Sequence, residues 1–175
     1  MKKRHLVYAI ALIVGMGACA ASAKKQAEAK PDVWKSYNVG TVLFEDKASE
    51  TKGSDSYHRI IPDAESYIKE QARTVLATLY NSPEDSITPV NKIHYTLEDI
   101  EGISAKGGGN GDVTIFYSTR HIEKSFAEND TAKLFFETRG VLLHELTHAY
   151  QLEPQGIGSY GTNRVFWAFI EGMAD

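Results

Sequence analysis

The chain has 175 residues, 42% of them hydrophobic, which is enough for one domain with a sizeable core. It contains 19 Lys and Arg against 23 Asp and Glu, so its formal net charge at pH 7 is −4. This acidic balance excludes the basic surface with which proteins bind DNA or RNA by charge, and we expect no nucleic-acid partner.

Residues 1–23 have the composition of a signal peptide. Three basic residues near the amino terminus precede an apolar run over residues 6–18, which is too short to span a bilayer readily. Cleavage after Ala23, in the sequence Ala-Ser-Ala, would release a secreted or periplasmic protein. We favour the alternative cleavage before Cys19, because residues 16–19 resemble a bacterial lipobox and this cysteine is the only one. A lipid on Cys19 would then hold the exported protein in the cell envelope as its one membrane attachment.

The remainder of the chain is interpreted as a tether over residues 24–38 and a single domain over residues 39–175. Without the three basic residues of the signal, 16 of the 19 Lys and Arg remain against all 23 acidic residues, a net charge of −7. No second apolar run suggests a membrane span. This part has no internal disulfide, so packing and bound metal have to stabilise it.

The domain is expected to begin with a strand, a loop and a long helix. Residues 39–44 predict the strand, and the polar residues 48–57 predict the loop. Residues 62–80 predict the helix, which Pro83 prevents from continuing. Its expected inner face consists of apolar residues at helical spacing: Ile68, Ala72, Val75, Leu76 and Leu79.

Two further strands are predicted over residues 92–97 and 113–118, with a glycine-rich run at residues 107–111 between them. We reject a phosphate-binding loop, because no Gly-Lys-Ser/Thr follows the run and it leads into a strand. It is interpreted as a flexible turn, or as the approach to an edge strand over residues 112–118 that lines a cleft and aligns an extended peptide. With two helices following, the order of elements predicts an α+β fold with a small antiparallel or mixed sheet and a long helix before it.

Residues 131–152 contain no proline and predict a helix. Its expected core-facing stripe is formed by four apolar residues: Phe135, Leu142, Leu146 and Ala149. His144 and His148 lie nearly opposite this stripe. Three other side chains surround them on the helical wheel: Glu137, Val141 and Gln151. This placement favours a site in a cleft over buried structural histidines.

The sequence from His144 to His148 is His-Glu-Leu-Thr-His. Histidines four residues apart lie on one face of a helix, close enough for both imidazoles to reach one zinc ion. The carboxylate of Glu145 can then take a proton from a water bound to that ion. The pattern therefore predicts two zinc ligands and a general base on one helical turn.

A last helix, capped by Thr162 or Asn163, is expected to supply the third ligand. Its expected core face consists of four apolar residues: Phe166, Phe169, Ile170 and Met173. Glu171 projects from the other side and would complete the ligand set, leaving the fourth position of the zinc ion to water. Asp175, one turn later, would accept the other ring N–H of a ligating histidine. The alternative is that both acids are solvated surface residues.

Together these two motifs resemble a known family. The sequences VLLHELTHAYQ and FWAFIEGMAD are similar to those of the basic secretory protein family, zinc peptidases of plants and bacteria. TVLFEDKAS, PVNKIHYTLED and GDVTIFYSTRHIEK follow the family's order of elements, so the resemblance covers residues 39–175. It implies zinc ligands at His144, His148 and Glu171, a general base at Glu145, and active-site helices like those of the glutamate zincins. Because the family normally continues beyond the second motif, we expect a chain truncated at its carboxyl terminus.

The leading hypothesis is an exported zinc-dependent metalloendopeptidase that hydrolyses a peptide or protein substrate. The alternative is a catalytically silent, exported zinc-binding or interaction protein, in which the metal is structural or the cleft incomplete. Three tyrosines are candidates for donating a phenol hydrogen bond to the substrate carbonyl: Tyr117, Tyr150 and Tyr160. Their spacing in the sequence does not favour one over the others. The remaining histidines considered are interpreted as structural or surface residues: His58, His94 and His121.

Overall fold

The computed structural model of the chain describes four segments: residues 32–85, 89–126, 130–151 and 164–175. The predicted signal peptide with Cys19 lies outside the described residues, as do Tyr160 and the candidate cap residues Thr162 and Asn163. Within the described segments, no helix combines the length and the apolar character that crossing a membrane requires.

The described body begins seven residues before the first predicted strand, at Asp32. Trp34 is 5% exposed and belongs to the hydrophobic core, and the ring of Tyr37 packs against it with 5.1 Å between centroids. The part of the expected tether that the structure describes, residues 32–38, therefore packs onto the domain. Burial of the large indole ring gives the physical reason.

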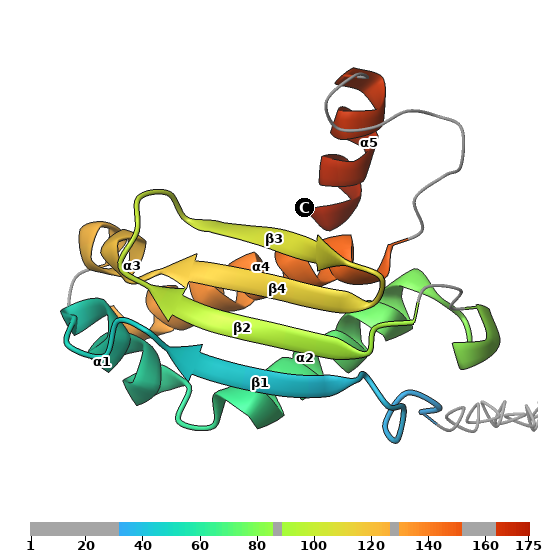
Figure 1. Cartoon of the computed structure of the whole chain (residues 1–175), viewed down its shortest axis with the longest axis horizontal. Helices are drawn as coiled ribbons and strands as arrows, with labels where there is room; N and C mark the ends of the chain where they lie inside the picture. Colours follow the sequence, from blue (N-terminus) through green and yellow to red (C-terminus); the bar gives the residue numbers. More distant parts are fainter. Residues whose placement is uncertain (1–31, 86–88, 127–129, 152–163) are drawn as a thin grey trace, which may run out of the picture. The chain divides into compact units, whose positions relative to one another are not determined.

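In the part of the chain that the structure describes, four strands form one mixed sheet in the order β1-β2-β4-β3 (Figure 1). They are β1 (Thr41–Asp46), β2 (Lys92–Glu98), β3 (Ser104–Gly109) and β4 (Asp112–Ser118). Strand β2 lies parallel to both β1 and β4, and β3 pairs antiparallel with β4. The mixed sheet and the helices around it confirm the predicted α+β class.

The prediction that residues 112–118 form an edge strand is wrong. Strand β4 lies inside the sheet between β2 and β3, and the edge beside it is β3, which includes three of the glycines interpreted as a turn. The turn is shorter, at Asn110 (φ 53°) and Gly111 (φ 84°). Asn-Gly with two positive φ values is the preferred two-residue connection of a hairpin, and it places Ser104 opposite Tyr117.

Within the four described segments, five α-helices accompany the sheet: α1 (Lys52–Ile60), α2 (Ala64–Leu79), α3 (Thr119–Ser125), α4 (Thr131–Tyr150) and α5 (Arg164–Ala174). A short 3₁₀ helix over Pro83–Asp85 follows α2. Figure 1 shows α1, α2 and α4 on one face of the sheet, and α5 standing beyond its β3 edge. The long helix before the last strands and the two helices after them are present as predicted.

Helix α1 occupies most of the segment expected to be a polar loop, so that prediction is wrong. The side chain of Thr51 caps the helix by accepting a hydrogen bond from the N–H of Ser54 at 3.2 Å. The inner face of α1 is formed by Gly53, Ser54 and Tyr57, all buried. Small and polar residues on this face explain why hydrophobic periodicity did not indicate a helix.

The core lies between the sheet and helices α2 and α4. The expected inner face of α2 is buried from Ile68 to Leu76, and Leu79 is partly buried. In α4 the expected stripe is displaced at its start, because Leu134 is 2% exposed and Phe135 is 39% exposed. The stripe runs at intervals of four residues through Leu134, Thr138, Leu142 and Leu146. In α5 two of the four expected residues are buried: Phe166 and Ile170.

Candidate metal centre

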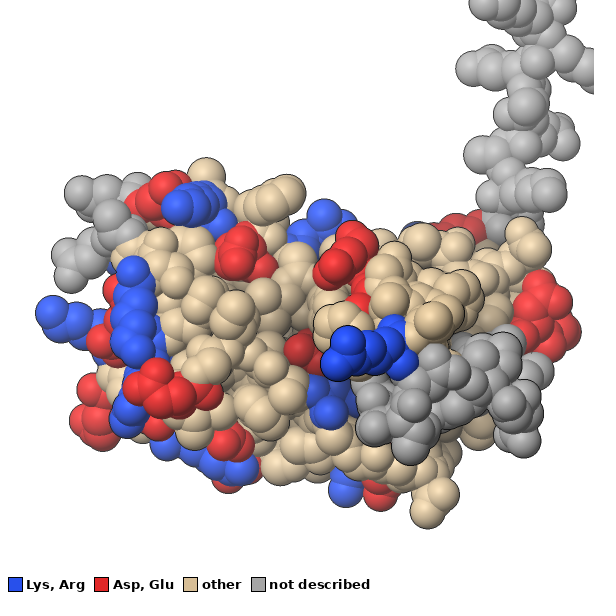
Figure 2. All heavy atoms as spheres, turned by 90° about the horizontal axis from the view of Figure 1, so that it is seen from above, with Lys and Arg blue, Asp and Glu red and all other residues tan. Residues whose placement is uncertain are grey.

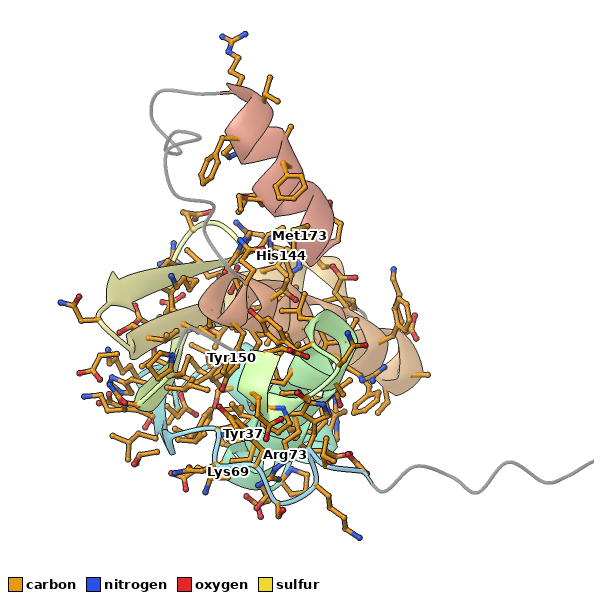
Figure 3. All side chains as sticks on the ribbon, turned by 90° about the vertical axis from the view of Figure 1, so that its right-hand side faces the viewer. Tyr37, Lys69, Arg73, His144, Tyr150 and Met173 are labelled. Carbon is orange, nitrogen blue, oxygen red and sulfur yellow. The ribbon has the colours of Figure 1, made fainter. Side chains whose placement is uncertain are left out.

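Helix α4 presents its two histidines on the side opposite its buried stripe. Leu142 and Leu146 anchor the helix in the core, while the side chains of His144 and His148 are 27% and 9% exposed. Helix α4 also contacts the edge strand β3 and helix α5. Figure 3 shows His144 under the end of α5 that carries Met173, so three elements meet at the histidines.

The side chains of His144, His148 and Glu171 converge on one point. The two Nε2 atoms of the histidines are 3.0 Å apart. The Glu171 Oε2 atom lies 3.3 Å from the Nε2 of His144 and 3.4 Å from that of His148. In a tetrahedral zinc site with bonds of about 2.05 Å, neighbouring ligand atoms are about 3.3 Å apart. The three atoms thus have the spacing of three corners of a zinc coordination shell.

This donor set also suits zinc chemically. Two imidazole nitrogens and one carboxylate oxygen form the ligand set of many catalytic zinc sites, with a fourth position left for water. Two imidazole Nε2 atoms 3.0 Å apart direct their lone pairs at each other unless a proton or a cation lies between them. Among the described residues, no other group of three His, Cys, Asp or Glu side chains has this arrangement. The residues therefore fit a zinc ion.

Asp175 contacts the ring nitrogen of His144 that faces away from this point. Its Oδ1 atom lies 3.0 Å from His144 Nδ1, where it can accept the ring N–H. A hydrogen on Nδ1 leaves the Nε2 lone pair free for a metal. The side chain of Asp175 is 79% exposed, so solvent competes for this hydrogen bond.

Gln151 has the corresponding position beside His148. Its side-chain amide is 3.1 Å from His148 Nδ1, and the residue is only 4% exposed. With the amide nitrogen facing the ring, its Oε1 atom is buried without a partner. A His148 that binds metal through Nε2 carries its hydrogen on Nδ1, and that hydrogen requires an acceptor. Turning the amide of Gln151 by half a turn supplies this acceptor, so Gln151 fits a metal-binding His148.

Glu145 lies beside the converging ligands in a buried position, with 6% of the residue exposed. Burial raises the pKa of its carboxyl group above the ordinary value, while the charges of His144 and Lys106 and the hydroxyl of Ser104 partly oppose this. A carboxylate whose proton affinity is raised in this way is a better general base near neutral pH.

Two cavities of about 440 Å³ and 500 Å³ adjoin the converging ligands, and both are lined by Ser104, His144 and Glu145. The smaller cavity also has an apolar wall: Ile103, Phe136 and Val141. The larger one continues along the glycine-rich strand β3 and includes Lys106. Figure 2 views the molecule from the side of α5 and shows acidic and basic side chains interspersed over this face. Together the cavities form a cleft along β3 and across the histidines.

The candidate phenol donors within the described residues lie elsewhere. Tyr117 is fully buried and lines neither cavity. Tyr150 donates a hydrogen bond from its hydroxyl to the carbonyl oxygen of Val39 at 3.0 Å. Both are structural residues of the core.

The three other histidines in the described part of the chain lie outside the ligand set. His58 contacts Asp46 at 2.9 Å, His94 contacts Glu45 at 3.0 Å, and each ring is partly exposed. His121 of α3 lies 3.9 Å from Glu137 of α4. Their acidic partners agree with the interpretation as structural or surface residues.

Two polar residues of the cleft wall, and a third residue beside His148, were given no role in the site from the sequence. Ser104 and Lys106 belong to β3, and the Asn-Gly pair after it would have indicated a hairpin and therefore an edge strand. Gln151 follows His148 by three residues, which places it one helical turn away, and that spacing alone predicts the contact.

Comparison with known proteins identifies a family for the chain. The family model described as "peptidase of plants and bacteria" matches residues 39–175, which contain every residue of the centre. No curated protein and no solved structure matches the chain. The chain therefore belongs to the basic secretory protein family, the peptidases of plants and bacteria.

Proposed function

We propose that this peptidase depends on zinc, that His144, His148 and Glu171 hold the ion, and that the protein hydrolyses peptide bonds in peptides or proteins. The observation that carries the proposal is the triangle of ligand atoms with sides of 3.0, 3.3 and 3.4 Å. A peptidase fold that brings these atoms together beside a buried carboxylate has the parts that hydrolysis requires.

The side chains divide the chemistry between them. Held by His144, His148 and Glu171, a zinc ion would supply Lewis-acid chemistry: polarisation of the scissile carbonyl and a lower pKa, about 7, for a bound water. Glu145 accepts the proton of the attacking water and passes it to the leaving amine. Asp175 and Gln151 hold the two imidazoles with their Nε2 atoms towards the ion.

The edge strand β3 would align the substrate. Its far side has no strand partner among the described residues, so its backbone N–H and C=O groups can pair with an extended peptide. A peptide laid along β3 would pass over the ligand triangle, because both line the same cavity.

We also infer that the protein acts outside the cytoplasm. The support is the basic and apolar composition of residues 1–23, with Cys19 directly after the apolar run. Labelling of the protein with a radioactive fatty acid, lost in Cys19→Ala, would identify it as a lipoprotein. Release of unlabelled protein into the periplasm or medium would favour an ordinary signal peptide.

The proposed function is tested by zinc content and hydrolysis together. We expect one zinc per chain, cleavage of an unstructured protein such as casein, loss of cleavage with a chelator, and recovery when zinc is restored. Glu145→Gln should keep the zinc and lose cleavage, because only the proton acceptor is removed. Cleavage by zinc-loaded Glu145→Gln would contradict the role of this residue. One zinc per chain without hydrolysis of any peptide would instead support the silent zinc-binding alternative.

A further inference from the structure

We propose that Lys106 forms a subsite for a carboxylate of the substrate, either an Asp or Glu side chain or the carboxyl terminus of a peptide. This inference rests on the proposed function and names a substrate class for the same cleft. It is carried by the position of Lys106 in the sheet, by the lack of an acidic partner for it among the described residues, and by the charges along the cleft.

The register of the sheet places Lys106 on the cleft side of the edge strand. Lys106 is paired with Ile115 of β4, whose side chain is fully buried under the helices. Directly opposed residues of an antiparallel pair project to the same face, so Lys106 also projects towards the helical layer. At the edge this layer is α4, and Lys106 lines the larger cavity together with His148 and Glu171. The half-buried lysine thus stands within the cleft.

Lys106 has no acidic partner within 4.0 Å among the described residues, whereas other lysines do. Lys47 lies 3.1 Å from Glu98, and Lys124 lies 3.1 Å from Glu101. Lys106 is nevertheless close to the centre, because it lines the same cavity as Glu145, His148 and Glu171. Its ammonium group is therefore directed at the cleft without a local ion pair.

The charge balance of the larger cavity leaves this lysine uncompensated when zinc is bound, because Glu137 and Asp175 line only the smaller cavity. The two positive charges of a zinc ion are offset by the carboxylates of Glu171 and Glu145, both beside the ligand triangle. Lys106 is the only Lys or Arg among the described residues that line the two cavities. Its positive charge remains available to a substrate carboxylate.

The two ends of the cleft differ in the side chains they can accept. Next to Lys106, the strand continues with Gly107 and Gly108, which have no side chains that screen the ammonium group. The other end combines the apolar wall around Phe136 with the carboxylates of Glu137 and Asp175. An extended substrate would therefore place its carboxylate at the glycine end and an apolar or basic residue at the other.

The experiment measures peptide binding to zinc-loaded Glu145→Gln protein, so that no substrate is consumed. A fluorescent, uncharged heptapeptide is compared with variants in which one Glu replaces Gln at each position in turn. A further pair differs only in having a free or an amidated carboxyl terminus. We expect one of the peptides that carry a carboxylate to bind about fivefold more tightly than the matching neutral peptide. This difference in affinity should shrink as salt is added.

Substitution of the lysine identifies the source of this preference. Lys106→Met keeps the aliphatic length, removes the charge and should abolish the preference, while Lys106→Glu should reverse it in favour of a Lys-containing peptide. Lys92→Met is the matched control, because Lys92 lies in β2 and its charge is 3.9 Å from Asp112. This control should bind all peptides as the parent does.

The outcomes separate this inference from the proposed function. Equal binding of charged and neutral peptides in every arm, absence of binding by all of them, or a preference that survives in Lys106→Met would overturn the role of Lys106. Cleavage of the same peptides by the unsubstituted protein tests the peptidase function separately. A carboxylate preference without cleavage would support the role of Lys106 and contradict the proposed peptidase function. Cleavage without a carboxylate preference would support the peptidase function and contradict the role of Lys106.

Discussion

Replacement of Gln151 by Leu should weaken zinc binding, although Gln151 is not a ligand. Leucine has a similar volume but offers no acceptor to the Nδ1–H of His148, which is 3.1 Å from the amide in a position that is 4% exposed. Loss of a hydrogen-bond partner by a buried donor costs about 1–3 kcal/mol. Since this loss falls on the metal-binding tautomer of His148, it should raise the zinc dissociation constant by about 5- to 150-fold.

Competition with a chromophoric chelator measures this dissociation constant, and thermal unfolding of the zinc-free protein measures stability separately. Gln151→Glu retains an acceptor and should bind zinc at least as tightly as the parent. Gln71→Leu is the control, because it removes another buried glutamine that lines neither cavity of the cleft. The Oε1 atom of Gln71 accepts a hydrogen bond from Arg139 Nε at 3.0 Å. It should lower stability without changing zinc affinity. Parental zinc affinity in Gln151→Leu would refute the reasoning.

Two further predictions concern the stability of the fold. Burial raises the pKa of Asp46, but hydrogen bonds from Ser54, Ala48 and His58 bring it below its ordinary value. Asp46→Asn should therefore lower the free energy of unfolding by about 1–3 kcal/mol at neutral pH. The difference between variant and parent should narrow as the pH falls below about 4, because Asp46 of the parent then becomes protonated. Denaturant titrations at several pH values measure it. A constant difference down to pH 3 would argue against the charge. Gly53→Ala should destabilise the protein by about 1–3 kcal/mol, because its Cβ would lie 2.3 Å from the carbonyl oxygen of Thr119. Gly140→Ala, with nothing within 4 Å, should raise the melting temperature slightly, and equal melting temperatures of the two variants would contradict this account.

The sequence by itself determined those features that depend on local geometry. Histidines four residues apart in a helix share a face whatever the rest of the chain does, so His144 and His148 were identifiable as a pair. The strands β1, β2 and β4, and the helices α2, α4 and α5, follow apolar periodicity or capping residues in the same way. Strand β3 was not predicted from the sequence, because its glycines carry no side chain that favours a strand.

Tertiary structure decided how closely side chains of other elements approach the two histidines. Glu171 is distant from them in sequence, and its contacts at 3.3 and 3.4 Å arise from the packing of α5 across α4. Lys106 enters the cleft only because pairing with Ile115 turns it towards the helical layer at the edge of the sheet. A helix sets the spacing of its own side chains by backbone geometry, whereas distances between elements depend on every residue that packs the core, and no local pattern contains them.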